Sequence, residues 1–498
     1  MEQRAMLALD MGASNGRVVW GMWEQDRLAM RELHRFENVP IERDGLMCWD
    51  IDRLLGDIRA GMRKCAEVGL RFDSVGLCSW GNTIGALDAQ GSLLLPPLHY
   101  REPATDAALE GLYRIMDRRA LFERTLFVPM SIQPSVVLRY LMERYPRQMG
   151  EAKQILMISD LMNYLLCGVA RSERTMAATS GMVDMRSGEW DRELMERIGL
   201  RRDWFPGMAS SGTPLGPLRD EFMRELGWAK APMVVAVSGH DTASAAGTMP
   251  ACDAANSLYL SCGTWSCMGC RVDAPVEGKA IFRSGATNDL GIFGEKHLRF
   301  NHTGLWILQE CRRWWNARGA KLSHADLAAR AAESPAFIAV IDTEDSSFFA
   351  PGDMPAKVAQ FCRTTGQRIP EGPGEIARVV LESLALRYRY SAEVLSRLSG
   401  VRFETMRLMG GGARNALLCQ MSADALGLRV LAGPTEASTI GNMIQQGLAT
   451  GTLESRERAC EILRRQGEIA CFAPQGATGW DAQYAKALQI CGWKDIDC

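Results

Sequence analysis

The sequence of 498 residues has few histidines, no long apolar run and almost no net charge, and each absence excludes a class of protein. Six histidines without an H-E-x-x-H motif give no support for a zinc hydrolase. No apolar stretch reaches the roughly 18 to 20 residues that a membrane-spanning helix needs, and no signal peptide is recognisable, so a cytoplasmic location is expected. The 57 basic and 59 acidic residues nearly cancel, which favours a small-molecule partner over nucleic acid or a membrane.

The sequence also lacks a Walker A motif, so any nucleotide site must use another loop. Its fifteen cysteines are scattered, which is typical of reduced, buried thiols in a cytosolic protein. Cys262, Cys267 and Cys270 do have the C-x₄-C-x₂-C spacing of some iron–sulfur proteins. Because a cluster needs four ligands and no fourth cysteine stands out by spacing, we expect these three on ordinary strands.

What is present is an alternation of strand-like and helical patterns, which predicts a layered α/β fold. The length exceeds one compact core, so two or three domains are expected, with a boundary near residue 244. The first two strands flank a tight turn, and this strand, turn and strand pattern recurs past the midpoint. The predicted strands cover residues 6–10, 17–23, 74–78, 233–237, 257–268 and 406–409, and the predicted helices run from Asp50 or Asp52 to about Gly69, from Gly374 to Gly400 and from about Asn415 to Leu426.

The first turn, Gly12 to Gly16, fits the G-x-S-x-G pattern of hydrolases. A nucleophile elbow requires a helix after the turn, whereas a strand is predicted here. The alternative is an anion cradle, in which glycines let a phosphate approach backbone N–H groups and Ser14 and Arg17 add donors. Asp10 could then lie near a phosphate-bound Mg²⁺. The simpler alternative is that Asp10 caps the turn and Arg17 is a solvated strand residue.

Asp241 follows a predicted apolar strand and begins a segment of small residues. It could be a helix cap, or it could be the carboxylate that accepts a hydroxyl proton during phosphoryl transfer. The turn around Gly263 and Thr264 could offer amides and a hydroxyl to a phosphate, although it could equally be an ordinary hairpin. Three glycines at 410–412, between a strand and a helix, would let a flat group or a phosphate approach the backbone.

Taken together, these segments resemble the FGGY family of carbohydrate kinases. Within that family, further segments resemble the rhamnulokinase subfamily. The segments that carry the resemblance are D-x-G-A-S-x-G-R at 10–17, G-H-D-T-A-S at 239–244, G-T-W-S at 263–266 and G-G-G-A-R-N at 410–415, with Y-R at 100–101, N-x-x-G-L-W-x-L-Q at 301–309 and A-G-P-x-E-A-S-T-x-G-N at 432–442 for the subfamily.

The resemblance implies two actin-like (ribonuclease H-like) domains, at 1–243 and 244–498, that flank a cleft for ATP and a sugar. It implies Mg-ATP as phosphoryl donor and a ketose as acceptor, most simply L-rhamnulose, with L-fuculose or another ketose or deoxyketose as the alternative. The implied roles are Asp241 as proton acceptor, Asp10 at the metal, Ala13, Ser14, Asn15, Gly16, Arg17, Thr264, Gln309 and Gly411 at ATP, and Gly81, His240, Thr242 and Asn301 at the sugar.

Two segments depart from the rhamnulokinase pattern. Residues 78–84 read C-S-W-G-N-T-I where D-T-W-G-V-D-F is expected, so two carboxylates beside the sugar site are replaced by Cys78 and Thr83. A Phe-Asn-Thr-like segment is also absent around Gln133. Because polar groups that pair with substrate hydroxyls discriminate strongly, these departures leave the preferred sugar open. They also leave open a non-catalytic sugar or nucleotide sensor, and the phosphate hairpins alone would suit an actin-like ATPase acting on a protein.

Overall fold

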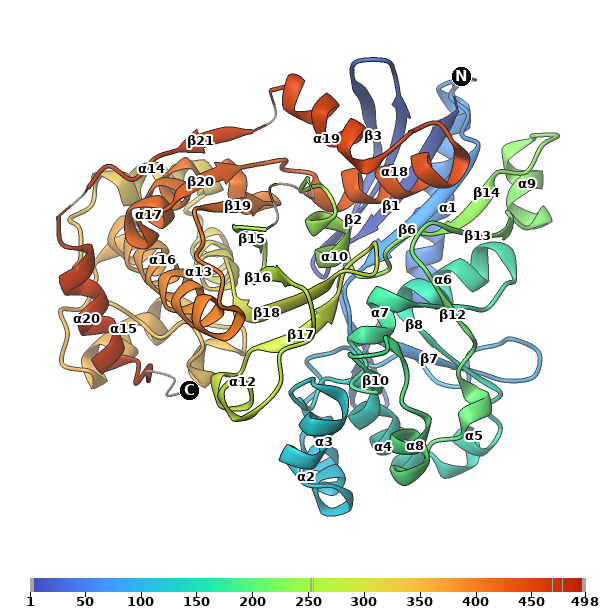
Figure 1. Cartoon of the computed structure of the whole chain (residues 1–498), viewed down its shortest axis with the longest axis horizontal. Helices are drawn as coiled ribbons and strands as arrows, with labels where there is room; N and C mark the ends of the chain where they lie inside the picture. Colours follow the sequence, from blue (N-terminus) through green and yellow to red (C-terminus); the bar gives the residue numbers. More distant parts are fainter. Residues whose placement is uncertain (1–3, 251–252, 254, 468, 477, 495–498) are drawn as a thin grey trace.

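The computed structural model describes residues 4–250, 253, 255–467, 469–476 and 478–494. The chain forms two lobes, each built around a mixed β-sheet with helices packed on it (Figure 1). The first sheet has six strands, in the order β13 (Thr213–Pro217), β14 (Met233–Ala236), β6 (Ser74–Ser79), β1 (Ala5–Met11), β2 (Asn15–Trp23) and β3 (Leu28–Glu37). The second has seven, in the order β17 (Thr287–Leu290), β18 (Lys296–Thr303), β16 (Trp265–Val272), β15 (Ser257–Cys262), β19 (Thr405–Met409), β20 (Arg429–Ala432) and β21 (Ala470–Phe472).

The two sheets share one topology, which is the α/β architecture expected from the sequence. In each, an antiparallel three-stranded unit (β1, β2 and β3, or β15, β16 and β18) is followed by two parallel strands and an antiparallel edge strand. The second sheet differs by the extra edge strand β17. The recurrence of the strand, turn and strand pattern in the sequence therefore reflects a repeated unit of structure.

Helices cover the sheets where the hydrophobic periodicity predicted them. Asp50 is the N-cap of α1 and accepts a hydrogen bond from the N–H of Arg53 at 3.0 Å, so the cap is Asp50 rather than Asp52. The longer helices of the first lobe are α1 (Ile51–Glu67), α2 (Asp106–Ile115), α3 (Arg118–Thr125), α4 (Pro134–Arg144) and α6 (Ile158–Cys167), with the shorter α5 (Pro146–Gly150), α7 (Arg174–Ala178), α8 (Arg192–Arg197), α9 (Asp220–Leu226) and α10 (Asp241–Ala246).

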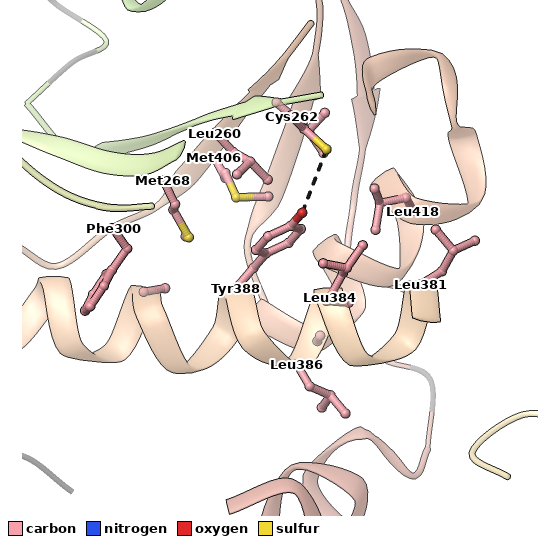
Figure 2. Packing of buried hydrophobic residues seen from close by; sticks show 14 of the residues in the cluster. Leu260, Cys262, Met268, Phe300, Leu381, Leu384, Leu386, Tyr388, Met406 and Leu418 are labelled. Atoms are coloured by element: carbon pink, nitrogen blue, oxygen red, sulfur yellow. Dashed lines mark hydrogen bonds between the residues drawn. The ribbon is translucent and has the colours of Figure 1, made fainter. Parts of the chain in front are cut away.

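The second lobe surrounds one long helix, α16 (Gly372–Ser399), whose side chains are buried along most of its length. Figure 2 shows Leu384 and Tyr388 of this helix packed against the strands that carry Leu260 and Met268. The other helices of this half are α12 (Lys279–Ser284), α13 (Trp306–Asn316), α14 (His324–Glu333), α15 (Met354–Thr364), α17 (Ala416–Leu426), α18 (Ala437–Thr450), α19 (Arg456–Arg465) and α20 (Trp480–Ile490). Among the described residues, none of the helices combines the length and apolar character needed to cross a bilayer.

Helix α18 returns from the second half of the chain to pack on the first sheet, beside β1 and β6 (Figure 1). Ile440, Met443 and Ile444 of α18 join the apolar cluster that contains Met6 and Val19. Helices α10 and α18 cross closely at Gly441, where a Cβ would lie only 1.9 Å from the carbonyl oxygen of Ser244. The two lobes are therefore joined by this helix crossing, and the division of the chain at residue 243 stays a prediction.

Candidate active site

A cleft between the lobes collects residues that the sequence places hundreds of positions apart. All but two of the predicted site residues line it, namely Asp10, Ala13, Ser14, Asn15, Arg17, Gly81, His240, Asp241, Thr242, Thr264, Asn301 and Gly411. The structure thus brings the predicted phosphate, base and sugar residues into one continuous space, while their individual roles stay predictions.

Gly16 and Gln309 are the two predicted residues that do not line the cleft, and both support residues that do. A Cβ on Gly16 would lie 2.2 Å from the ring of Phe36, so only glycine fits beneath this hairpin. Thr264 donates a hydrogen bond to Gln309 Oε1 at 3.1 Å. Gln309 therefore orients the side chain of Thr264 without lining the cleft itself.

The two glycine-containing hairpins face each other across the cleft. In the first, Gly12 N–H donates to the Asn15 carbonyl at 2.9 Å, and β2 continues directly from the turn, which is why a hydrolase elbow does not form. The hydroxyl oxygens of Ser14 and Thr264, one from each hairpin, lie 3.2 Å apart. Gly411 borders the same space and has no atom within 4 Å of the position that a Cβ would occupy. Backbone amides and hydroxyls from both lobes thus converge where the phosphates are predicted.

The second hairpin, formed by β15, β16 and the turn at Gly263 and Thr264, packs against the buried core of its lobe. Tyr388 of α16 points up at β15 and β16, with its hydroxyl 3.8 Å from Cys262 Sγ (Figure 2) and 2.7 Å from Ser266 Oγ. Cys262 and Cys270 belong to this core, and both Cys262 and Cys267 line the cleft. Among the described residues, the three cysteines with iron–sulfur spacing do not form a group that could hold a metal ion. Each cysteine that the structure describes is a free thiol.

Asp10 and Arg17 form the charged centre of the first hairpin. Asp10 is buried and accepts hydrogen bonds from Arg17 Nη2 at 2.6 Å and from the hydroxyls of Ser438 and Thr439 at 2.7 Å each. Arg17 also pairs with Glu436 and is largely buried, so it is not a solvated strand residue. Ser438 and Thr439 come from α18, and no local pattern in the sequence indicated their contact with Asp10.

Asp241 is the first residue of α10, directly after β14 and its loop. The N-cap of this helix is His240, so the interpretation of Asp241 as the cap is wrong. Its carboxylate accepts from Thr242 Oγ1 at 3.3 Å and otherwise faces the cleft, with 30% of the side chain exposed. Burial, and then the negative charge of Asp10, raise the pKa of Asp241 to about 7. Such a group can accept a proton at neutral pH.

The loop that carries His240 and Asp241 is held by a buried carboxylate, that of Glu173. Glu173 accepts from Gly239 N–H at 2.9 Å and from Thr175 Oγ1 at 2.6 Å. A Cβ on Gly239 would lie 2.2 Å from Ser159 Oγ, so the loop also depends on glycine. Sequence reasoning missed Glu173, because nothing in its local pattern distinguishes it from a solvated acid.

Three aromatic residues line the cleft, Trp80, Tyr100 and Trp265, and together they form what we call the aromatic wall; Gly81 and Asn301 line the same cleft. The indole N–H of Trp265 donates to the hydroxyl of Tyr100 at 3.4 Å. Tyr100 and Trp265 lie inside segments that carried the family resemblance, which was the only sequence signal for them. The wall can pack against apolar faces of a sugar while the residues around it supply polar contacts.

Cys78 and Thr83, the two departures from the rhamnulokinase pattern, are both buried and neither lines the cleft. The two side chains therefore do not line the cleft, contrary to the expectation that positions 78 and 83 lie beside the sugar. Thr83 Oγ1 accepts the indole N–H groups of Trp80 at 3.0 Å and Trp49 at 3.2 Å. Cys78 Sγ lies 3.7 Å from Asp10 Oδ1, and burial raises the pKa of this thiol. Both residues support cleft residues.

The third departure, at Gln133, is also structural. Its side-chain amide donates to the Val128 carbonyl at 3.1 Å and accepts from Met130 N–H at 3.3 Å. This fixes the loop that presents Met130 and Ile132 to the cleft.

The cleft offers few ligands to a metal ion. Among the residues that the structure describes, no three His, Cys, Asp or Glu side chains are grouped so as to hold a metal by themselves. Magnesium usually takes one or two carboxylates together with phosphate oxygens and water. Asp10 and Asp241 both line the cleft, and their mutual repulsion raises the pKa of Asp241. This pair of carboxylates fits a phosphate-bound Mg²⁺.

Comparison with known protein families decides the relationship. Residues 5–247 match the N-terminal domain of the FGGY family of carbohydrate kinases, and residues 258–450 match its C-terminal domain. The chain belongs to the FGGY family of carbohydrate kinases. The predicted fold and the predicted enzyme class are confirmed, and this FGGY kinase is an ATP-dependent sugar kinase.

The FGGY kinase is similar to several curated rhamnulokinases along nearly its whole length. It is 35% identical to that of Bacteroides thetaiotaomicron, with 96% of this chain and 97% of the relative covered. It is 35% identical to that of Klebsiella pneumoniae, with 95% of each covered, and 33% identical to that of Halalkalibacterium halodurans, with 92% and 96% covered.

Solved structures share the fold of this FGGY kinase at low sequence identity. Xylulose kinase from Rhodospirillum rubrum superposes with a TM-score of 0.77 at 18% identity and covers 99% of this chain and 98% of its own. Glycerol kinase from Plasmodium falciparum, solved with ADP, has a TM-score of 0.75 at 14% identity, with 98% and 97% covered.

Proposed function

We propose that this sugar kinase transfers the γ-phosphoryl group of Mg-ATP to the O1 hydroxyl of L-rhamnulose, which gives L-rhamnulose 1-phosphate and ADP. The observation that carries the proposal is Asp241, a carboxylate with a pKa of about 7 that lines the same cleft as the two hairpins and the aromatic wall. The curated rhamnulokinases, about one third identical over nearly the full length, support the choice of sugar.

Asp241 is the general base in this proposal. As the sugar O1 attacks the γ-phosphorus, the O1–H proton passes to the Asp241 carboxylate and the bond between the β,γ-bridging oxygen and the γ-phosphorus breaks. The electron pair of that bond stays on ADP. A base with a pKa near 7 is ionised in a large fraction of molecules at neutral pH and still binds a proton well enough to assist the attack.

Both hairpins hold the phosphates. Backbone N–H groups from Ala13 to Arg17, together with the hydroxyls of Ser14 and Thr264, surround the place where the β- and γ-phosphates would lie. Gly411 leaves open space for the nucleotide on the side of the second lobe. Mg²⁺, near Asp10 and Asp241, would neutralise the developing charge on the phosphate oxygens.

The sugar site consists of Gly81, His240, Thr242 and Asn301, beside the aromatic wall. Of the departures, Thr83 lies behind Trp80 and Cys78 lies beside Asp10, and neither side chain lines the cleft where the sugar is proposed. No observation therefore favours the non-catalytic sensor. L-Fuculose stays as the alternative acceptor, since it differs from L-rhamnulose only in the configuration of a hydroxyl group. We also propose that the enzyme is cytoplasmic.

A panel of ketoses tests the substrate. The enzyme is incubated with Mg-ATP and with L-rhamnulose, L-fuculose, L-ribulose, D-xylulose or D-fructose, and ADP release is followed together with phosphorus NMR of the product. The proposal expects the highest kcat/KM for L-rhamnulose and a primary phosphate ester at C1. A higher kcat/KM for any other member of the panel would contradict the choice of sugar while leaving the sugar kinase assignment intact.

The variant Asp241→Asn tests the base. Removal of the proton acceptor should lower kcat by about 10²- to 10⁴-fold, with ATP affinity nearly unchanged, because the hairpins are untouched. Asp203→Asn is the matched control, since Asp203 is exposed and pairs with Arg201 away from the cleft. Near-normal turnover of Asp241→Asn would refute its role as the base.

A further inference from the structure

Two side chains of the proposed sugar site, His240 and Asn301, come from different lobes and lie beside the same buried ion pair. Arg299 and Asp289 lie side by side on the adjacent strands β18 and β17, and Arg299 Nε donates to Asp289 Oδ2. Their exposed fractions are 2% and 4%, so both charges are almost completely removed from solvent. A buried ion pair gives little net stability, which makes its location beside a sugar site informative.

Arg299 fixes the orientation of the Asn301 amide. Its Nη1 donates to Asn301 Oδ1, and Cys267 Sγ lies 3.1 Å from the same oxygen. A guanidinium has only donors, so the amide cannot be turned the other way without placing two donors against each other. The Nδ2 group of Asn301 is therefore left to donate to a molecule in the cleft.

Asp289 faces the imidazole of His240. The Nδ1 atom of His240 is buried without a hydrogen-bond partner, and Asp289 Oδ2 is 3.9 Å from it. Asp241 Oδ1 lies 3.9 Å from the other ring nitrogen, Nε2. Nδ1 is the nitrogen that is enclosed without a partner, so a proton on Nδ1, directed at Asp289, satisfies it and leaves Nε2 as an acceptor.

We propose that the Asp289–Arg299 ion pair is the positioning element of the sugar site, because it makes His240 Nε2 an acceptor and Asn301 Nδ2 a donor toward the sugar. The site then recognises one sugar hydroxyl that donates to His240 of the first lobe and one sugar oxygen that accepts from Asn301 of the second lobe. A bound sugar links the lobes, and closing the 3.9 Å gap between His240 Nδ1 and Asp289 Oδ2 would complete the hydrogen bond that Nδ1 lacks.

This inference rests on the proposed sugar site but not on the identity of the ketose. It is therefore tested with whichever member of the ketose panel the wild-type enzyme phosphorylates with the highest kcat/KM. Rejection of L-rhamnulose by the wild-type enzyme would overturn the proposed substrate alone.

The principal variant is the double substitution Asp289→Leu with Arg299→Met, which removes both charges and leaves neither buried without its partner. Asp289→Asn is the second variant, which keeps the shape of the side chain and removes its charge. Glu382→Gln is the matched control, because Glu382 is 1% exposed and pairs with Arg378 on α16, outside the cleft. Thermal unfolding and ADP binding by calorimetry establish that each variant is folded.

We expect the double variant to raise KM for the ketose by about 10- to 100-fold, which corresponds to the loss of one or two oriented hydrogen bonds. KM for ATP should stay within about twofold, because the phosphate hairpins are untouched. Asp289→Asn should raise KM for the ketose in the same direction by about three- to tenfold, and the control should leave it unchanged.

An unchanged KM for the ketose in the folded double variant would overturn the proposal. A parallel loss of ATP and ketose affinity would also overturn it, because it would show a general structural role. If the double variant does not fold, the Asp289→Asn variant provides the test. An unchanged KM for the ketose in that variant would overturn the proposal.

Discussion

Neutralising Asp241 should make the protein more stable as it makes the enzyme inactive. The pKa of Asp241 is raised from 3.8 to about 7, first by burial and then by the charge of Asp10. Between these two pH values the folded protein holds a proton on Asp241 that the unfolded chain has lost. The free energy of unfolding therefore falls as pH rises through this window, and the full decrease is present above pH 7. Asp241→Asn removes the charge that causes this decrease.

The size of the effect follows from the shift in pKa. One unit corresponds to about 1.4 kcal/mol, so a shift of roughly three units represents at most ~4 kcal/mol. Because 30% of the side chain is exposed, solvent screens part of the interaction, and a gain of about 2 kcal/mol at pH 8 is the reasonable expectation. At pH 5 the gain should be less than half as large, and below pH 4 it should vanish.

Thermal unfolding of wild type and Asp241→Asn at pH 5 and pH 8 measures this difference. Nucleotide is left out and a chelator is added, so that no cation compensates the charge. Asp203→Asn is again the control, and since a hydrogen bond from Arg201 lowers the pKa of Asp203, that variant should gain no stability. A midpoint for Asp241→Asn that is unchanged or lowered at pH 8, or raised equally at both pH values, would refute the electrostatic reasoning.

Two further predictions concern the hairpins and the connection between lobes. Thr264→Val removes the hydroxyl that donates to Gln309, so it should raise KM for ATP about three- to tenfold and leave KM for the ketose unchanged in steady-state kinetics. Gly441→Ala places a Cβ 1.9 Å from the Ser244 carbonyl, so it should lower the free energy of unfolding by about 1–3 kcal/mol, whereas Gly56→Ala, with no atom within 4 Å of the added Cβ, should not.

The sequence was sufficient to predict those parts of the site that depend on short-range patterns. The first hairpin could be recognised because a strand resumes after Gly16, and Asp241 because an apolar strand ends just before it. Each of these features is encoded within about ten residues. The same patterns predicted the second hairpin and thereby the repeated α/β unit.

The remaining parts depend on contacts between distant segments. Asp10 is held by hydroxyls on α18, more than 400 positions away, and Asp289 faces His240 only because β17 is an edge strand beside the first lobe. The hydrophobic periodicity of a sequence does not indicate such contacts between distant segments. The expectation that Thr83 lies beside the sugar was wrong for a related reason. Its neighbours in sequence line the cleft, whereas its own side chain lies behind Trp80.

The repeated topology also places two carboxylates at matching positions, of which only one suits the role of the proposed base. Asp241 begins α10 directly after the strand β14, and Glu436 is the N-cap of α18 directly after the corresponding strand β20. Glu436 is paired with Arg17 and with Arg414, so its charge is neutralised and its oxygens are occupied. Among the residues that the structure describes, Asp241 has no cationic partner within 4 Å other than His240, whose ring is neutral at pH 7. The duplicated fold places an acidic side chain at the start of each of these helices, and of the two only Asp241 lines the cleft without a charged partner that would oppose the uptake of a proton.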